Sequence, residues 1–311
     1  MEKKLSVVVS VYNEEQALPL FYETTKLILE ILPWDYELLF VNDGSRDDSL
    51  SILREFAAHD EKVKVVSFSR NFGHEAAMIA GIDYAKGDGI VCMDADLQHP
   101  PETLISMYHL WEQGWEVIEG VKKSRGTESL LHKESAGFFY GIMSKATGVN
   151  MQNASDFKLL DRKAVNALLT MKEKNAFFRA LSSWVGFKTV KVEFEVRERT
   201  VGQSKWSAWA LVKYAFNNIS SFSAAPMQIV TILGAMMLIA SLILGIAALY
   251  QKIVGIAVDG FTTVILLQLF SGSIIMMSLG IIGYYIAKIY DEIKDRPRYI
   301  IAEECGGTDE K

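Results

Sequence analysis

A pair of acids at the end of an apolar run is the feature of this sequence best suited to chemistry. Asp94 and Asp96 close the run at residues 89–93, within GIVCMDADLQHPPE. Side chains at i and i+2 of an extended chain project to the same side, so both carboxylates can face one hard cation, and Gln98 adds an oxygen. Mg²⁺ or Mn²⁺ held by few protein oxygens completes its shell with water and substrate phosphate. The spacing predicts a metal site for a diphosphate substrate; the alternative is that the acids cap the helix beginning at Pro100.

A second acid stands at the end of another apolar run. Asp43 lies in VNDGSRDDS, and Gly44 behind it indicates a tight turn. A carboxylate on such a turn can accept hydrogen bonds from a nucleobase or a ribose, although an Asp-Gly pair also occurs as a plain turn. Tyr12, Asn13 and Glu14 close the first apolar run of the chain. Three strand ends with polar groups therefore predict one polar crevice.

These polar groups need a sheet to bring them together, and the first two thirds of the chain predict one. Short β-branched runs alternate with helical patterns, which is typical of an α/β, doubly wound, mostly parallel sheet. Ser45, with Asp48 three residues later, resembles a capping box at the start of the second helix. Ligands of such a sheet bind at the carboxyl ends of its strands. We expect strands at residues 5–11, 37–42, 63–67, 89–93 and 116–120, and helices at 15–31 and 48–59.

The apolar residues are unevenly distributed over the 311 positions. Mean hydropathy is +0.15, although 32 basic and 38 acidic side chains are present. Residues 224–250 and 260–287 carry no charge, and each run exceeds the ~20 residues needed to cross ~30 Å of hydrocarbon. Two membrane spans are predicted, and a soluble protein is excluded. Residues 206–223, with Trp206 and Trp209, predict an interfacial helix; a core helix of the soluble domain is the alternative.

Charge around the two spans predicts their orientation. The loop at 251–259 carries only Lys252 as a cation, whereas both flanks are basic. By the positive-inside rule we expect both termini and a domain at 1–205 on the cytoplasmic side of the cell membrane. An interfacial helix at 206–223, a transmembrane hairpin at 224–290 and a cytoplasmic tail at 291–311 would follow. The net charge of −6 argues against a nucleic-acid partner, and Cys92 and Cys305 alone predict no disulfide framework.

Six motifs together resemble a known family. VVVSVYNEE, VNDGS, FSRNFGHEAAMIAGIDYAKGD, DADLQHPPE, SDFKLLDR and RTVGQSKW follow one another over most of residues 5–210. They resemble family 2 glycosyltransferases of the GT-A fold, and within them the dolichol-phosphate mannose synthase-like enzymes; the two spans resemble bacterial members. The resemblance implies inverting, metal-dependent transfer of one sugar from a nucleotide diphosphate sugar to polyprenyl phosphate at the cytoplasmic face. UDP-glucose is the first expected donor, before UDP-N-acetylglucosamine and GDP-mannose.

The resemblance also implies site residues. The nucleotide-sugar pocket would contain Val11, Tyr12, Glu14, Asp43, Arg70, Asp94, Ala95, Arg199 and Lys205. The metal, Mg²⁺ or Mn²⁺, would be held by Asp96 and Gln98 with Asp94. The lipid phosphate would be bound by Lys122, Arg125, Lys133, Ser135 and Ser204. The family often has arginine where this chain has Lys122 and Lys133, which keeps the charge but loses bidentate geometry.

Asp96 and Asp156 are the expected catalytic residues. Asp156, in SDFKLLDR, resembles the acid proposed as base in the family; capping the next helix is the alternative. A phosphate monoester has a second pKa of about 6 and is largely ionised at pH 7, so no strong base is required. We therefore expect Asp156 to orient the acceptor. His74 and His99 either touch substrate or are satisfied loop and core residues.

Two other functions remain open. A processive polysaccharide synthase of the same fold would carry more spans and a Gln-x-x-Arg-Trp motif, which Gln203-Ser-Lys-Trp does not match. A non-catalytic nucleotide-sugar-binding membrane protein would not need Asp94, Asp96 and Gln98. A homo-oligomer and a lipid-sugar flippase are further partner hypotheses; small residues of the second span would permit close helix packing, namely Ser271, Gly272, Ser273, Gly280 and Gly283.

Overall fold

The computed structural model describes residues 3–123, 154–171, 178–196, 225–255 and 260–307. The chain forms two compact units. The first comprises Met1–Asn218 with Pro297–Lys311, and the second comprises Ile219–Arg296. Some predictions fall outside the described residues and stay predictions: the helix at 206–223, and the site roles of Arg125, Lys133, Ser135, Arg199, Ser204 and Lys205.

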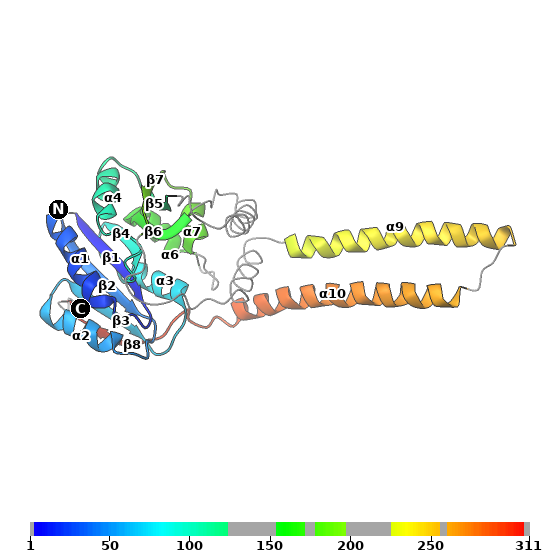
Figure 1. Cartoon of the computed structure of the whole chain (residues 1–311), viewed down its shortest axis with the longest axis horizontal. Coiled ribbons are helices and arrows are strands. Elements are labelled where there is room, and N and C mark those ends of the chain that lie inside the picture. Colours follow the sequence, from blue (N-terminus) through cyan, green and yellow to red (C-terminus); the bar gives the residue numbers. More distant parts are fainter. Residues whose placement is uncertain (1–2, 124–153, 172–177, 197–224, 256–259, 308–311) are drawn as a thin grey trace. The chain divides into compact units, whose positions relative to one another are not determined.

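A mixed, mostly parallel sheet of eight strands forms the first unit, in the order β7-β5-β6-β4-β1-β2-β3-β8 (Figure 1). The strands at its centre are parallel, and β6 and β8 run antiparallel to their neighbours. The α/β class is confirmed, and the five predicted strands occur within two residues of their expected bounds. The strands are β1 (Lys4–Val11), β2 (Asp35–Asn42), β3 (Val63–Phe68), β4 (Gly89–Asp94), β5 (Val117–Lys122), β6 (Ala154–Asp161), β7 (Thr189–Phe194) and β8 (Ile301–Cys305).

Helices cover both faces of this sheet, which explains why its central strands are apolar on both sides. Val7 and Val9 of β1 belong to a core with Phe21 and Leu53 of the helices on one face. On the other face, the helix that contains Gly81 packs directly on β1. A Cβ at Gly81 would lie 2.1 Å from Val8 Cγ1, so glycine is needed for this close approach. The helices of this unit are α1 (Leu18–Ile31), α2 (Ser49–His59), α3 (His74–Tyr84), α4 (Thr103–Glu112), α6 (Arg162–Leu169) and α7 (Phe178–Trp184).

The predicted capping box at the start of α2 is wrong. The helix begins at Ser49, and its N-cap residue Asp48 makes no side-chain cap hydrogen bond. Ser45 Oγ instead accepts a hydrogen bond from Asn13 N at 3.0 Å, and Ser49 Oγ accepts one from Glu14 N at 2.9 Å. The serines thus tie the turn after β2 to the turn after β1. The first helix likewise begins at Leu18 rather than at residue 15, because the backbone just before it hydrogen-bonds to the turn after β2.

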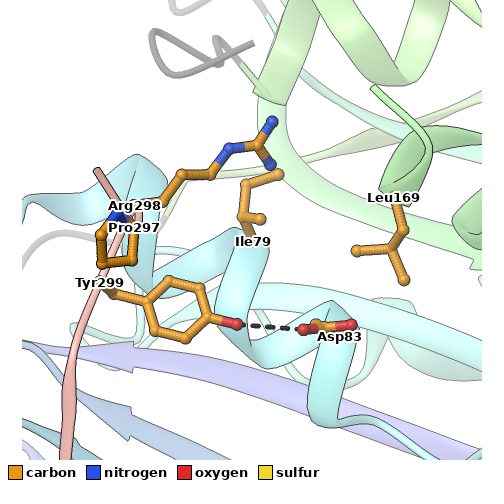
Figure 2. A pocket seen from close by; sticks show the side chains of 6 residues that line it. All are labelled: Ile79, Asp83, Leu169, Pro297, Arg298 and Tyr299. Carbon is orange, nitrogen blue, oxygen red and sulfur yellow. Dashed lines mark hydrogen bonds between the residues drawn. The ribbon is translucent and has the colours of Figure 1, made fainter. Parts of the chain in front are cut away.

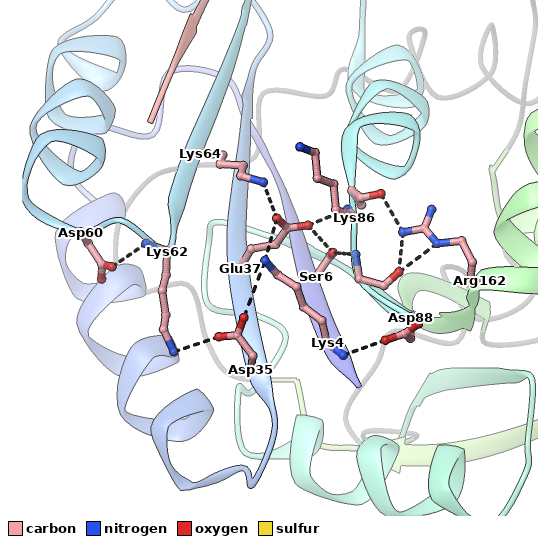
Figure 3. A network of polar contacts seen from close by, with 12 residues as sticks. Lys4, Ser6, Asp35, Glu37, Asp60, Lys62, Lys64, Lys86, Asp88 and Arg162 are labelled. Atoms are coloured by element: carbon pink, nitrogen blue, oxygen red, sulfur yellow. Dashed lines mark hydrogen bonds and ion pairs between the residues drawn. The ribbon is translucent and has the colours of Figure 1, made fainter. Parts of the chain in front are cut away.

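Polar and ionic contacts centred on the buried Glu37 connect the amino-terminal ends of the strands (Figure 3). Glu37 is 1% exposed and accepts hydrogen bonds from Ser6 Oγ at 2.6 Å and Lys64 Nζ at 2.7 Å. Arg162 Nε donates to the carbonyl of Gly87 at 2.9 Å. A Cβ at Gly87 would lie 2.6 Å from Ser6 N, so only glycine permits this approach. The network stabilises the edge opposite the carboxyl ends of the parallel strands.

The last residues of the chain return to the sheet. Residues 291–311 were expected to form a tail, but β8 pairs antiparallel with β3, and Arg54 makes a two-bond ion pair with Glu303. Before β8, Tyr299 stacks on Phe68 at 5.1 Å and donates to Asp83 at 3.0 Å. This segment borders a cavity of about 380 Å³ (Figure 2), which is lined by Ile79, Asp83, Leu169, Pro297, Arg298 and Tyr299.

The second unit contains two long apolar helices, α9 (Ala225–Ile253) and α10 (Phe261–Ile293). Val230–Gln251 and Leu267–Ile293 are long and apolar enough to cross a membrane. None of the side chains that the structure describes in these windows is buried within the protein, which sets the two helices apart from core helices of a soluble domain. The two predicted apolar helices are therefore present, although α10 continues beyond residue 287.

Candidate active site

The carboxyl ends of three parallel strands bring the predicted polar groups to one edge. In the register of the sheet, Ser10 lies opposite Asp94 and Val11 opposite Asn42. Ser10 Oγ lies 3.5 Å from Asp94 Oδ1. Asp43 follows Asn42 directly. The polar residues predicted to share one crevice thus lie at one edge of the sheet, in and beside the turns after β1, β2 and β4.

Two of these turns hold non-glycine residues in the left-handed region, where side chains are disfavoured. Asn13 has φ 56° and Leu97 has φ 60°. Asn13 is held by its side chain, because Asn13 Oδ1 accepts from Arg46 N at 2.8 Å. Leu97 lies in the turn at residues 94–98, the acidic turn, and is held there because Asp96 Oδ1 accepts a hydrogen bond from Gln98 N at 3.1 Å. Such enforced backbone conformations are typical of functional sites.

Asp43 is buried and shapes the loop before α3. Its two carboxylate oxygens accept from Phe72 N at 2.6 Å and Gly73 N at 2.9 Å. Burial raises the pKa of this carboxyl, against the two backbone hydrogen bonds and the charge of His74. The same loop carries Arg70, whose guanidinium lies 4.3 Å from the Phe72 ring centroid. Binding of a nucleoside by Asp43 and Arg70 stays a prediction.

Asp156 reaches the same edge through an antiparallel strand. β6 runs opposite to β4, so the start of β6 lies beside the end of β4. Arg179 of α7 makes two hydrogen bonds to the buried Asp156 carboxylate, at 2.8 and 2.6 Å. His74 Nε2 lies 3.5 Å from Asp156 Oδ2 and 3.8 Å from Asp94 Oδ1, and His74 Nδ1 lies 2.9 Å from Ser10 Oγ. The histidine therefore connects the two acids.

Charge within this cluster fixes its ionisation. Burial opposes ionisation of Asp156, but the charge of Arg179 and the hydrogen bonds from His74 and Arg179 hold the pKa of that carboxyl well below its usual range. Desolvation also opposes the charged imidazole, yet the hydrogen bond to Asp156 and the charges of Asp94 and Asp156 raise the pKa of His74 to about 10. The lowered pKa and the pairing with Arg179 make the Asp156 carboxylate a weak base.

Neither Asp156 nor the pair Asp94 and Asp96 caps a helix. Asp161 caps α6 by accepting from Lys163 N at 2.9 Å, and Asp156 lies within β6. The residue before α4 is Glu102, which makes no side-chain cap hydrogen bond. Both capping alternatives for the site acids are therefore wrong.

His99 is a supporting residue. It is 4% exposed, its ring stacks on Phe157 with centroids 4.9 Å apart, and its Nδ1 accepts from Asp94 N at 3.2 Å. Burial lowers its pKa, so the neutral ring acts as a hydrogen-bond acceptor. His99 thus fixes the backbone from which the acidic turn begins.

The oxygen atoms of the acidic turn fit a hard cation. Asp94, Asp96 and Gln98 offer only oxygen ligands, and the Asp94 side chain is 33% exposed. Within the described residues no group of three or more His, Cys, Asp or Glu side chains could hold a metal alone. A cation here would take its remaining ligands from water and a substrate diphosphate. Mg²⁺ or Mn²⁺ is compatible with these residues.

The remaining predicted residues divide into three groups. Tyr12 is 38% exposed at the end of β1, and Lys122 is exposed at the end of β5, which runs parallel to β7. Val11 and Ala95 are buried, so only their backbone can face a ligand. Glu14 is partly exposed beside the turn after β2, where its N–H donates to Ser49.

Sequence reasoning missed Arg179 and the residue that supports it. Lys158 is fully buried and donates to Glu119 at 2.7 Å, to Ser182 Oγ at 2.8 Å and to the carbonyl of Arg179 at 3.2 Å. It thereby attaches α7 to β5 and β6. Arg179 lies in NAFFRALSSW, which has no spacing that indicates a site. Only pairing across the fold identifies it.

Comparisons with known proteins identify the family of this chain. The model of "Glycosyl transferase family 2" matches residues 6–169. Glycosyltransferase YkcC of Bacillus subtilis (strain 168) is 41% identical over 97% of this chain and 94% of its own length. A prophage-derived bactoprenol glucosyl transferase of Shigella flexneri is 36% identical over 98% and 99%, and a prophage bactoprenol glucosyl transferase homolog of Escherichia coli (strain K12) is 38% identical over 96% and 98%.

Solved structures are more distant. Glucosyl-3-phosphoglycerate synthase from Mycobacterium tuberculosis, in complex with Mn²⁺, UDP-glucose and phosphoglyceric acid, has a TM-score of 0.46 and 18% identity, covering 69% of this chain and 76% of that chain. The family match and the nearly full-length relatives define the protein as a glycosyltransferase. The chain belongs to glycosyl transferase family 2.

Proposed function

We propose that this enzyme transfers one sugar, with inversion, from a nucleotide diphosphate sugar to polyprenyl phosphate, with UDP-glucose as the first expected donor. The observation that carries the proposal is the match to bactoprenol glucosyl transferases over 96–98% of the chain, which includes both the family 2 domain and the two apolar helices. The product would be a lipid-linked monophosphosugar.

The donor diphosphate would lie at the acidic turn. Asp96 and Gln98, with Asp94, would hold Mg²⁺ or Mn²⁺, which supplies positive charge to the leaving nucleoside diphosphate when bound. The turns after β1 and β2 would position the nucleoside. An oxygen of the acceptor phosphate then attacks the anomeric carbon from the side opposite the diphosphate, which inverts the configuration.

Asp156 would not act as the base in this reaction. The acceptor is a phosphate monoester with a second pKa of about 6, so it is largely ionised at neutral pH. The Asp156 carboxylate is itself ionised and engaged by Arg179 through two hydrogen bonds. We infer that Asp156 organises the acceptor side of the site.

The membrane hairpin suits this acceptor, because its phosphate lies at the headgroup level. The chain leaves the first unit before α9 and re-enters the same sheet after α10 through β8. A hairpin that crosses the membrane twice returns the chain to the side from which it left. The positive-inside pattern favours the cytoplasm as that side.

Product analysis with the full chain in detergent tests the proposal. Radiolabelled UDP-glucose, UDP-N-acetylglucosamine and GDP-mannose are each incubated with undecaprenyl phosphate, with and without Mn²⁺. We expect UDP-glucose to give one glycolipid carrying a single sugar, and only when acceptor and Mn²⁺ are both present. Growth of a polymer, or sugar release without glycolipid in all three reactions, would refute polyprenyl-phosphate transfer.

A further inference from the structure

The side of the site that would receive the acceptor presents the guanidinium of Arg179 rather than the predicted acid. The Asp156 side chain is only 6% exposed, whereas Arg179 is 26% and His74 is 40% exposed. Arg179 and His74 both contact the Asp156 carboxylate. An anion that approaches from solvent therefore meets the guanidinium before it meets the carboxylate.

Arg179 is held in a defined orientation. Its Nε and Nη2 both bond to Asp156, which fixes the plane of the guanidinium, and its own carbonyl accepts from the buried Lys158. A guanidinium carries five N–H donors in a rigid fork, which matches the oxygens of a phosphate. Asp156 and Lys158 thus hold an arginine whose chemistry suits phosphate recognition.

A second cation lies nearby. Lys122 is exposed at the end of β5, on the edge where β4 also ends. Neighbouring atoms partly desolvate the ammonium of this exposed side chain, and this desolvation, followed by repulsion from Arg179, lowers the pKa of Lys122. An anion bound between two like charges relieves their repulsion.

We propose that Arg179 binds the phosphate of the acceptor lipid together with Lys122, and that Asp156 serves to hold the Arg179 guanidinium in place. This inference rests on the proposed function, since it assumes a phosphate-bearing acceptor. Arg179 would supply the bidentate contact to phosphate that the lysines at 122 and 133 cannot make. This arrangement also explains how a dianionic phosphate is accepted beside a buried carboxylate.

A double variant separates binding from a purely structural role. Arg179→Met alone leaves the buried Asp156 with only its 3.5 Å contact to His74, which destabilises the fold. Asp156→Asn combined with Arg179→Met removes that poorly compensated charge, so we expect the double variant to regain most of the lost thermal stability. Arg54→Met, which breaks the equivalent arginine–carboxylate pair with Glu303, is the matched control.

The readout is the KM for undecaprenyl phosphate, measured beside the KM for UDP-glucose. For the double variant we expect the acceptor KM to rise by at least tenfold and the donor KM to stay within twofold of the parent. Arg179→Lys should recover part of the acceptor affinity. The Arg54→Met control should keep both KM values.

Three results would overturn the inference. A folded double variant with the parental acceptor KM would mean that Arg179 is only the counter-ion of Asp156. An equal rise in both KM values would assign Arg179 to the donor or to general site structure. A parent enzyme that forms no glycolipid would refute the proposed function, and the acceptor role of Arg179 with it.

Discussion

Replacing Asp156 by Asn tests whether this acid acts by protonation or by position. The substitution keeps the size of the side chain and one carbonyl oxygen, so a hydrogen bond from Arg179 can persist. It removes the charge that currently accepts two bonds from the guanidinium, at 2.8 and 2.6 Å. Because Arg179 is 26% exposed, water can solvate the charge left behind. The protein should therefore remain folded.

The size of the effect follows from the bonds lost. A hydrogen bond to a charged group contributes about 1.5–3 kcal/mol, and each 1.36 kcal/mol is a factor of ten in rate. Loss of one such bond predicts that kcat/KM for the acceptor falls by roughly 10-fold to 100-fold. The pKa of Asp156 lies well below its usual range, so the carboxylate stays ionised from pH 6 to pH 9. The deficit should be the same throughout that interval.

The assay is kcat/KM for undecaprenyl phosphate at saturating donor, measured for parent and variant between pH 6 and pH 9. General-base catalysis would contribute about 10²-fold to 10⁴-fold, and its loss would shrink as rising pH ionises the acceptor fully. A deficit that closes by more than tenfold across this range, with unchanged donor affinity, would refute the positioning role and restore Asp156 as the base.

Three further predictions concern other parts of the chain. Asp96→Asn should abolish transfer in a folded protein, because it removes one charge from the proposed metal site; turnover within threefold of the parent at saturating Mn²⁺ would contradict this. In intact cells, an impermeant thiol reagent should label a cysteine at Gly255 but not one at Thr308, on a background without the native cysteines; the reverse pattern would contradict the orientation. Glu37→Gln should lower the free energy of unfolding by about 2–4 kcal/mol at pH 7 without changing the donor KM, because the 1% exposed Glu37 lies at the opposite edge of the sheet. Burial opposes ionisation of Glu37, but hydrogen bonds from Lys64 and Ser6 lower its pKa in the folded protein. The stability that Glu37 contributes should therefore be present above its unfolded-state pKa and vanish as pH falls through its folded-state pKa. Urea titrations of parent and variant at several pH values measure this, and a loss of stability that does not depend on pH would contradict it.

Much of the fold follows from local sequence patterns. Apolar β-branched runs predicted five central strands, since strands buried on both faces must be continuously apolar. The polar residues after three of these runs predicted the site edge, because parallel strands end on one side of the sheet. β6, β7 and β8 were not predicted. β8, with the sequence IAEEC, alternates in burial and becomes a strand by pairing with the open edge of β3.

The sequence by itself determined which polar residues end the central strands and where the two apolar helices lie, because each depends on residues that are neighbours along the chain. The tertiary structure alone decided which charges meet. Asp156 and Arg179 are 23 positions apart, and no periodicity relates them. Ser45 matched a helix cap locally, yet its hydroxyl bonds to Asn13 from a different strand end. Pairings of this kind depend on how strands and helices pack, and packing is a property of the whole sheet rather than of any local stretch of sequence.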